Sequence, residues 1–108
     1  MHNRLEQLLA LHNEEPDDAF TRYAIALEYN ARQEYGEAVR WFEELLRDAP
    51  DYVPTYYMLA GAYRATGAWE KAEQTYGTGI QVARKVGDAH AAAELASALE
   101  ELRDDSDD

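Results

Sequence analysis

A chain that repeats itself every 34 residues is restricted to architectures in which small, similar units stack side by side. When this sequence is shifted by 34 residues, residues 19–52 fall on residues 53–86, and 7 of the 34 aligned positions are identical. The identical pairs are Thr21/Thr55, Tyr23/Tyr57, Ala26/Ala60, Tyr29/Tyr63, Ala31/Ala65, Ala38/Ala72 and Ala49/Ala83. Pro16 and Pro50 have the same spacing, which predicts a further half unit before residue 19.

Each unit has the apolar spacing of two α-helices. In the second half of each unit, apolar or small side chains recur at intervals of three and four residues, as on one face of a helix. These stripes are Tyr35, Ala38, Val39, Phe42, Leu45 and Leu46, and then Trp69, Ala72, Tyr76, Gly79, Ile80 and Ala83. The first halves predict helices over about 18–32 and 54–66, with Asp18 as an N-cap and Pro54 in a first turn. Gly67 and Gly87 suit left-handed helix ends, and no strand is expected.

Helices are also expected on both sides of the two units. Leu5, Leu8, Leu9 and Leu11 predict a leading half-repeat helix within residues 1–15. An apolar stripe predicts a capping helix over residues 88–103, and its opposite face is polar: His90, Glu94, Ser97 and Glu101. We therefore expect an all-α domain over residues 1–103, with about six antiparallel helices, and an acidic, disordered tail over 104–108.

The repeated residues resemble the tetratricopeptide repeat, a helix-turn-helix unit of 34 residues, here in a small array of the bacterial type. The matching residues are Ile25, Ala26, Tyr29, Ala38, Phe42 and Pro50, followed by Tyr56, Leu59, Ala60, Tyr63, Ala72, Tyr76 and Gly79. The chain departs from the family pattern at Arg22, Leu45 and Arg84, where an aromatic residue, an alanine and a proline are expected. The resemblance implies a superhelical stack of helix pairs and a role as a protein-interaction scaffold or adaptor.

The first helix of each unit is apolar on a second face that its partner helix does not need. The resemblance implies that this face lines a concave groove for a peptide or partner helix. The expected groove residues are Phe20, Tyr23, Leu27, Asn30, Tyr57, Met58 and Arg64. Arg64 would orient an acidic group. Alternatively, neighbouring helices and the C-terminal helix cover much of the face themselves.

The side chains of this face favour an apolar or amphipathic ligand. The clamp that the family uses for C-terminal carboxylates needs Lys and Asn, whereas Tyr23, Leu27, Met58 and Gly61 occupy most of the corresponding sites. A different hypothesis is self-association, through the N-terminal leucines or through exchange of the C-terminal helix. The sequence determines neither the partner nor the oligomeric state.

The net charge of −12 restricts the partners further. It repels phosphate backbones and anionic lipid surfaces, so neither nucleic acid nor a membrane is an expected partner. Acidic residues outnumber basic ones by 22 to 10, and Lys71 and Lys85 are the only lysines in the sequence. This balance is typical of salt-adapted surfaces, although an ordinary acidic protein explains it equally well.

Catalytic and cofactor sites are not expected. The sequence lacks cysteine and any Gly-x-Ser-x-Gly or phosphate-binding Gly-Lys-Ser/Thr motif. His2, His12 and His90 are too far apart to predict a metal site, and Gly77 and Gly79 fit helix packing better than phosphate binding. No apolar run is long enough for a signal peptide or a membrane span, so a cytoplasmic location is expected.

Overall fold

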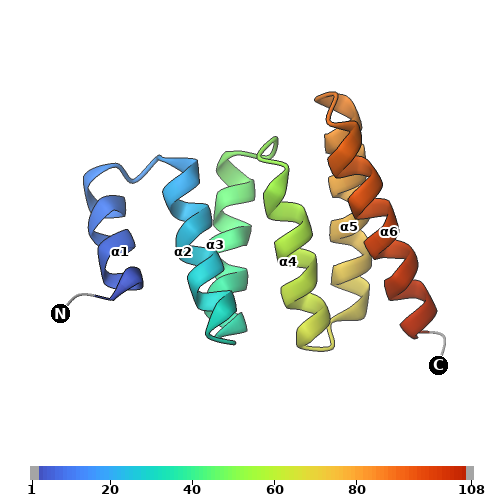
Figure 1. Ribbon diagram of the computed structural model, residues 1–108, viewed down its shortest axis with the longest axis horizontal. Helices are drawn as coiled ribbons and strands as arrows, with labels where there is room; N and C mark the ends of the chain where they lie inside the picture. The colour runs from blue at the N-terminus through green and yellow to red at the C-terminus, as the bar shows by residue number, and fades with distance from the viewer. Residues whose placement is uncertain (1–2, 107–108) are drawn as a thin grey trace.

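The computed structural model describes residues 3–106, which form six helices arranged as a row from α1 to α6 (Figure 1). The helices are α1 (Arg4–Glu14), α2 (Ala19–Ala31), α3 (Tyr35–Asp48), α4 (Pro54–Ala65), α5 (Trp69–Lys85) and α6 (Ala89–Ser106). Residues 3–106 contain no strand, and the molecule measures 45 × 31 × 20 Å. The predicted all-α repeat architecture is therefore confirmed as an elongated slab.

Consecutive helices pack as antiparallel neighbours, and α2, α4 and α6 lie side by side in one layer in front of α3 and α5 (Figure 1). The first residues of α2, α4 and α6 are Ala19, Pro54 and Ala89, which are separated by equal steps of 35 residues. Helix α6 thus takes the place of the first helix of a third unit. It forms one edge of the layer that contains α2 and α4.

The predicted helix starts agree with the structure to within one residue, which is the usual uncertainty of such boundaries. The Asp18 carboxylate caps α2 by accepting a 3.0 Å hydrogen bond from the Thr21 N–H. Asp88 caps α6 in the same way, accepting from the Ala91 N–H at 3.0 Å. Pro54 occupies the first turn of α4, where its missing N–H leaves no helical hydrogen bond unmade.

The turns within and after the two units share one hydrogen-bonding pattern. Gly67 and Gly87 have φ angles of 79° and 81°, as predicted for left-handed helix ends. Gln33 occupies the equivalent position in the first unit with a φ of 61°. In each turn the following N–H bonds back to the last helical turn: Glu34 to Tyr29 at 2.9 Å, Ala68 to Tyr63 at 2.8 Å and Asp88 to Ala83 at 2.8 Å.

The core lies between the two layers and depends on small residues at the helix contacts. Five alanines of the repeat pattern are completely buried, namely Ala26, Ala38, Ala60, Ala72 and Ala83. Their size allows the helix axes to approach closely, and larger side chains such as Phe42 and Ile25 fill the remaining space. Packing also explains Gly79, which is buried between α4 and α6.

The three departures from the family pattern have local explanations. Arg22 is buried, and its guanidinium pairs with the Asp48 carboxylate at the end of α3, 2.9 Å away. Leu45 fits as a fully buried core residue. Arg84, unlike a proline, keeps the N–H that a continuing helix needs, so α5 runs on to Lys85.

That extension shapes the end of the molecule. Helix α5 has 17 residues, whereas its counterpart α3 has 14. The turn between α5 and α6 consequently lies beyond the other turns at that end of the row (Figure 1). The start of α6 forms a wall beside α4, and this wall is part of the candidate site described below.

Two terminal features differ from the sequence-based expectations. The tail was expected to be disordered from residue 104, but α6 continues to Ser106 because Leu102 is buried and Asp105 pairs with Arg64 of α4. Residues 107 and 108 lie outside the described residues. In α1, Leu5 and Leu8 are buried as a stripe, whereas Leu11 points away and is half exposed.

Candidate functional site

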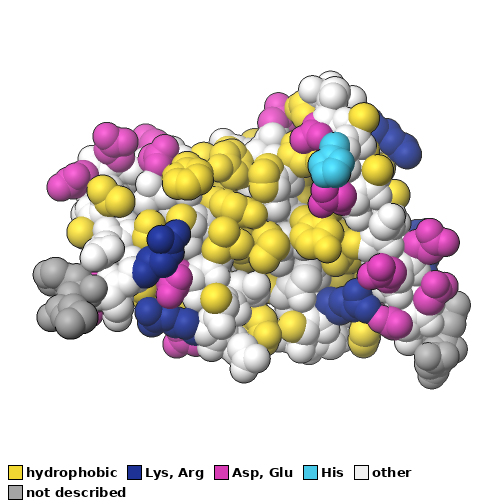
Figure 2. Space-filling model, viewed as in Figure 1, with side chains coloured by type: hydrophobic (Ala, Val, Ile, Leu, Met, Phe, Trp, Pro, Cys, Tyr) yellow, Lys and Arg dark blue, Asp and Glu magenta, His cyan; other side chains and the backbone are white. Residues whose placement is uncertain are grey.

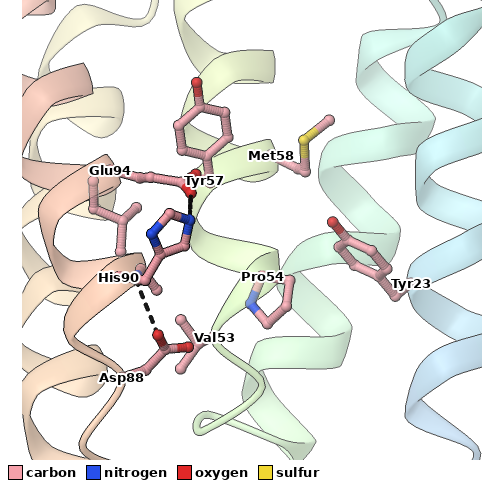
Figure 3. Close-up of a pocket in the computed structure, with 10 residues that line it drawn as sticks. Tyr23, Val53, Pro54, Tyr57, Met58, Asp88, His90 and Glu94 are labelled. Atoms are coloured by element: carbon pink, nitrogen blue, oxygen red, sulfur yellow. Dashed lines mark hydrogen bonds and ion pairs between the residues drawn. The ribbon is translucent and has the colours of Figure 1, made fainter.

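A pocket of about 240 Å³ opens between α4 and α6 on the face that α2, α4 and α6 share (Figure 3). Tyr23 of α2 borders it on one side, and Tyr57 and Met58 of α4 form its floor. The remaining lining comes from the residues around the starts of α4 and α6: Val53, Pro54, Asp88, His90, Ala91, Glu94 and Leu95. Two apolar helix faces and one polar wall therefore meet here.

The aromatic side chains of the pocket are held by rings of the core. Tyr23 packs against Phe42 and Tyr52, with ring centroids 6.0 and 5.6 Å apart. Burial raises the pKa of Tyr23, and the neighbouring Tyr52 hydroxyl raises it further, so Tyr23 stays neutral and apolar in character at physiological pH. Tyr57 packs edge-on against Tyr76 at 6.2 Å but remains 44% exposed. These contacts preorganise an apolar surface that solvent still reaches.

The wall on α6 is polar and acidic. Asp88 caps the helix, and the His90 imidazole pairs with the Glu94 carboxylate one turn later (Figure 3). Both His90 and Glu94 are exposed at the mouth of the pocket, opposite Tyr23 and Met58 (Figure 3). A ligand seated on the apolar floor would therefore have carboxylates along one of its sides.

A second hollow, of about 310 Å³, continues along α6 and shares Tyr57, His90 and Glu94 with the first. It extends past Ser97 to Glu101. Beyond it, the Arg64 guanidinium of α4 pairs with the Asp105 carboxylate near the end of α6. We call the two hollows together the α4–α6 groove.

The surface around this groove is apolar at its centre. Figure 2 shows hydrophobic side chains gathered over α2 and α4, with acidic side chains and a histidine along α6. Helix α6 borders this face and leaves it uncovered, as the exposure of Tyr57 and of Phe20 (67%) indicates. A contiguous exposed apolar surface of this kind is typical of interaction sites.

The structure brings together three of the seven residues predicted to line a groove: Tyr23, Tyr57 and Met58 line the same pocket. The other four do not line it. Phe20 is exposed at the start of α2, and Leu27 packs against the core while remaining partly accessible. The Asn30 side-chain oxygen is buried without a hydrogen-bond partner among the described residues, and Arg64 is engaged by Asp105.

Sequence reasoning missed the α6 side of the groove, because the polar face of a capping helix was assumed to meet only solvent. The missed residues are Asp88, His90, Ala91, Glu94 and Leu95, together with Val53 and Pro54 at the start of α4. One signal was available in the sequence. Asp88 follows a helix-ending glycine just as a first-helix cap would, which places α6 in line with α2 and α4.

Among residues 3–106, no group of three or more His, Asp or Glu side chains is arranged to hold a metal ion. His2 lies outside the described residues. Within the same range, none of the helices combines the length and the apolar character needed to cross a membrane.

Comparison with known proteins identifies the family. The family model of the tetratricopeptide repeat matches residues 29–99. A tetratricopeptide repeat domain protein from Salinibacter ruber, solved by NMR, is 40% identical, and the match covers 82% of this chain and 89% of that one with a TM-score of 0.78. The chain belongs to the tetratricopeptide repeat family. No curated protein matches the sequence.

More distant tetratricopeptide-like structures share the fold. A protein from Bordetella parapertussis is 22% identical over 97% of this chain and 91% of that one, with a TM-score of 0.86. The TPR2B domain of yeast Sti1, solved in complex with pHsp70, is 17% identical over 94% of this chain and 81% of that one, with a TM-score of 0.87. Tetratricopeptide repeats generally serve as non-enzymatic scaffolds for protein–protein interaction, and this chain has their fold.

Proposed function

We propose that this tetratricopeptide repeat protein binds an apolar or amphipathic segment of a partner protein in the α4–α6 groove. The observation that carries the proposal is Tyr57, a large aromatic residue that stays 44% exposed between two hollows. Tyr23 and Met58 extend its apolar surface across α2 and α4. A ligand that covers these side chains removes apolar area from water, which is the main source of affinity at such a surface.

The apolar anchors would supply most of the binding free energy. Tyr23, Tyr57 and Met58 would each contribute roughly 1.5–3 kcal/mol if a ligand buried them fully. Phe20 and Leu27 would extend the contact along α2. Asn30 and Arg64 lie toward the other end of the same helices and would limit the length of the bound segment.

An acidic peptide terminus is disfavoured as the ligand. Arg64, the basic side chain of α4 on this face, already pairs with Asp105. The remaining charged residues that line the groove are Asp88, Glu94 and Glu101, which repel a carboxylate, and His90, which pairs with Glu94. The groove therefore suits apolar side chains better than an acidic chain terminus.

Self-association through the N-terminal leucines receives less support. Leu5 and Leu8 are already buried within the chain, which leaves Leu11 as the main exposed leucine of α1. Light scattering over a range of protein concentrations separates the two functions. A mass that stays at one chain while the groove binds a peptide supports the proposed function, whereas a mass that rises with concentration favours self-association.

A defined peptide tests the proposal. The probe is an amphipathic helical peptide of about 16 residues, with leucines at intervals of three and four and lysines between them. Titrated into isotopically labelled protein, it should shift the amide resonances of Tyr23, Met58 and Leu95. Shifts confined to the α3–α5 layer, or no shifts at all, would exclude the groove as the binding surface.

Variants then separate binding from folding. Tyr57→Ala with Met58→Ala should weaken peptide binding by a factor of about 10 or more, because two anchors are lost. Trp69→Ala is the matched control, since Trp69 is a similarly exposed aromatic residue at the start of α5. It should leave the affinity unchanged, and circular dichroism should show that all these variants keep their helicity.

A further inference from the structure

The acidic wall of the groove says more about the partner than the apolar floor does. We infer that the bound segment is a basic amphipathic helix whose Lys or Arg side chains flank its apolar stripe and face α6. This inference rests on the proposed function, because it assumes that the α4–α6 groove is the binding surface.

The first step is the position of the carboxylates. Glu94 lines both hollows, Asp88 lines the first and Glu101 lines the second. Glu94 and Glu101 are seven residues apart, so they lie on one face of α6 and about 10 Å apart along its axis. Both are exposed to solvent. They form an acidic row parallel to the apolar floor.

The second step is that nearby positive charge does not cancel this row. Arg64 pairs with Asp105, which lies farther along α6. His90 pairs with Glu94, but an imidazole is only partly protonated at neutral pH. Residues 88–105 contain six acidic residues and one basic residue. Because the groove-lining residues from α2 and α4 are uncharged, the wall on α6 determines the charge that a ligand meets.

The third step is geometric complementarity. A partner helix lying along the groove would place its apolar stripe on Tyr57 and Met58, and one of its flanks would face α6. Helix α4 has 12 residues and is therefore about 18 Å long, which matches a partner helix of three to four turns. Basic side chains about two turns apart on that flank would meet Glu94 and Glu101.

A second copy of this chain does not have that chemistry. The whole chain carries a net charge of −12, so two copies repel each other. A symmetric contact between two such grooves would also bring two acidic rows together. The occupant we infer is consequently a different protein with a basic amphipathic segment.

The test compares two peptides of identical length and identical leucine stripe. One carries lysines beside the stripe and the other carries glutamates, and isothermal titration calorimetry measures both affinities. The lysine peptide should bind about five- to tenfold more tightly than the glutamate peptide, which corresponds to two exposed ion pairs. The difference should shrink as the salt concentration rises toward about 0.5 M, because exposed charges are screened.

Variants distinguish the acidic wall from the general acidity of the protein. Glu94→Gln with Glu101→Gln should remove most of the preference for the lysine peptide. Glu37→Gln with Glu70→Gln is the control, because it removes the same charge from exposed residues of α3 and α5 in the other layer. This control should keep the preference.

The outcomes separate the inference from the function beneath it. Equal binding of both peptides at the groove would keep the proposed function and overturn the basic partner. Equal loss of preference in the wall variant and the control variant would also overturn it, since net charge alone would then explain the selectivity. Failure of both peptides to shift the groove resonances would overturn the proposed function itself.

Discussion

Gly79 of α5 lies directly against Tyr56 of α4, so closely that a methyl group on Gly79 would be 2.6 Å from the Tyr56 Cβ atom. The same methyl group would be 3.1 Å from Leu95 of α6. Three helices thus converge on a position without a side chain. Gly79→Ala should lower the free energy of unfolding by about 1–2 kcal/mol, because the helices must move apart. Urea unfolding followed by circular dichroism measures this change.

Gly77 provides the control for that variant. It lies two residues earlier in α5, and a methyl group there would meet no atom within 4 Å. Gly77→Ala should therefore raise the free energy of unfolding by about 0.5–1 kcal/mol through helix propensity alone. Equal effects of the two substitutions would contradict the close contact between α4 and α5.

The turn at Gln33 offers a stabilising substitution. Gln33 has a φ of 61°, and Gly67 occupies the same place in the next unit with a φ of 79°. A residue with a Cβ atom is strained in this left-handed conformation by about 1–2 kcal/mol, of which the greater backbone freedom of glycine when unfolded offsets a part. Gln33→Gly should raise the thermal midpoint, whereas Gly67→Gln should lower it. The opposite signs would show that the two turns are not equivalent.

Tyr63 predicts a loss of stability at high pH. Its hydroxyl donates a 2.8 Å hydrogen bond to the Glu43 carboxylate of the preceding unit. Burial raises the pKa of Tyr63 well above its ordinary value of 10.0, and the bond to Glu43 raises it further. The unfolded chain therefore releases this proton at a lower pH than the folded chain does. The contribution is complete below about pH 10 and is lost as the pH rises above that value.

Urea unfolding between pH 8 and pH 11.5 measures this loss. Tyr63→Phe should make the decline above pH 10 less steep and should cost about 1 kcal/mol at neutral pH, where the hydrogen bond is intact. Glu43→Gln removes the charge that opposes ionisation, so it should also flatten the decline, but to a smaller degree. A slope unchanged by Tyr63→Phe would exclude Tyr63 as its source.

Added salt should stabilise the fold. The net charge of −12 gives strong self-repulsion, and salt screens it within a distance of about 10 Å at 0.1 M. If the acidic composition is an adaptation to salt, the melting temperature should climb steeply between low and molar sodium chloride. A flat response would favour the alternative of an ordinary acidic protein. Potassium chloride serves as the control for a specific effect of sodium.

Much of the fold followed from the sequence because the repeats carry the same information twice. Tyr29 and Tyr63, or Ala38 and Ala72, occupy the same place in each unit, so a pattern in one unit supported the assignment of the other. The helix boundaries followed from local chemistry, since Asp18, Pro54 and Gly67 act within a single turn. Such effects do not depend on distant parts of the chain.

The α6 side of the groove was harder to predict because it depends on the length of another helix. Helix α6 is rich in alanine and lacks the aromatic residues of α2 and α4, so its likeness to a first helix is weak in sequence. Its place beside α4 is set by the longer α5 and the turn at Gly87. The helical end of the tail likewise depends on Asp105 meeting Arg64, 41 residues earlier in the chain.

The central claim is that partner side chains bind on the floor of the α4–α6 groove, and intermolecular nuclear Overhauser effects in the complex with the lysine peptide test it most directly. The account predicts contacts from the leucine methyl groups of the peptide to the Met58 methyl group and the Tyr57 ring. Contacts instead to Leu46 of α3 or Thr78 of α5, which border a hollow in the other layer, would contradict it.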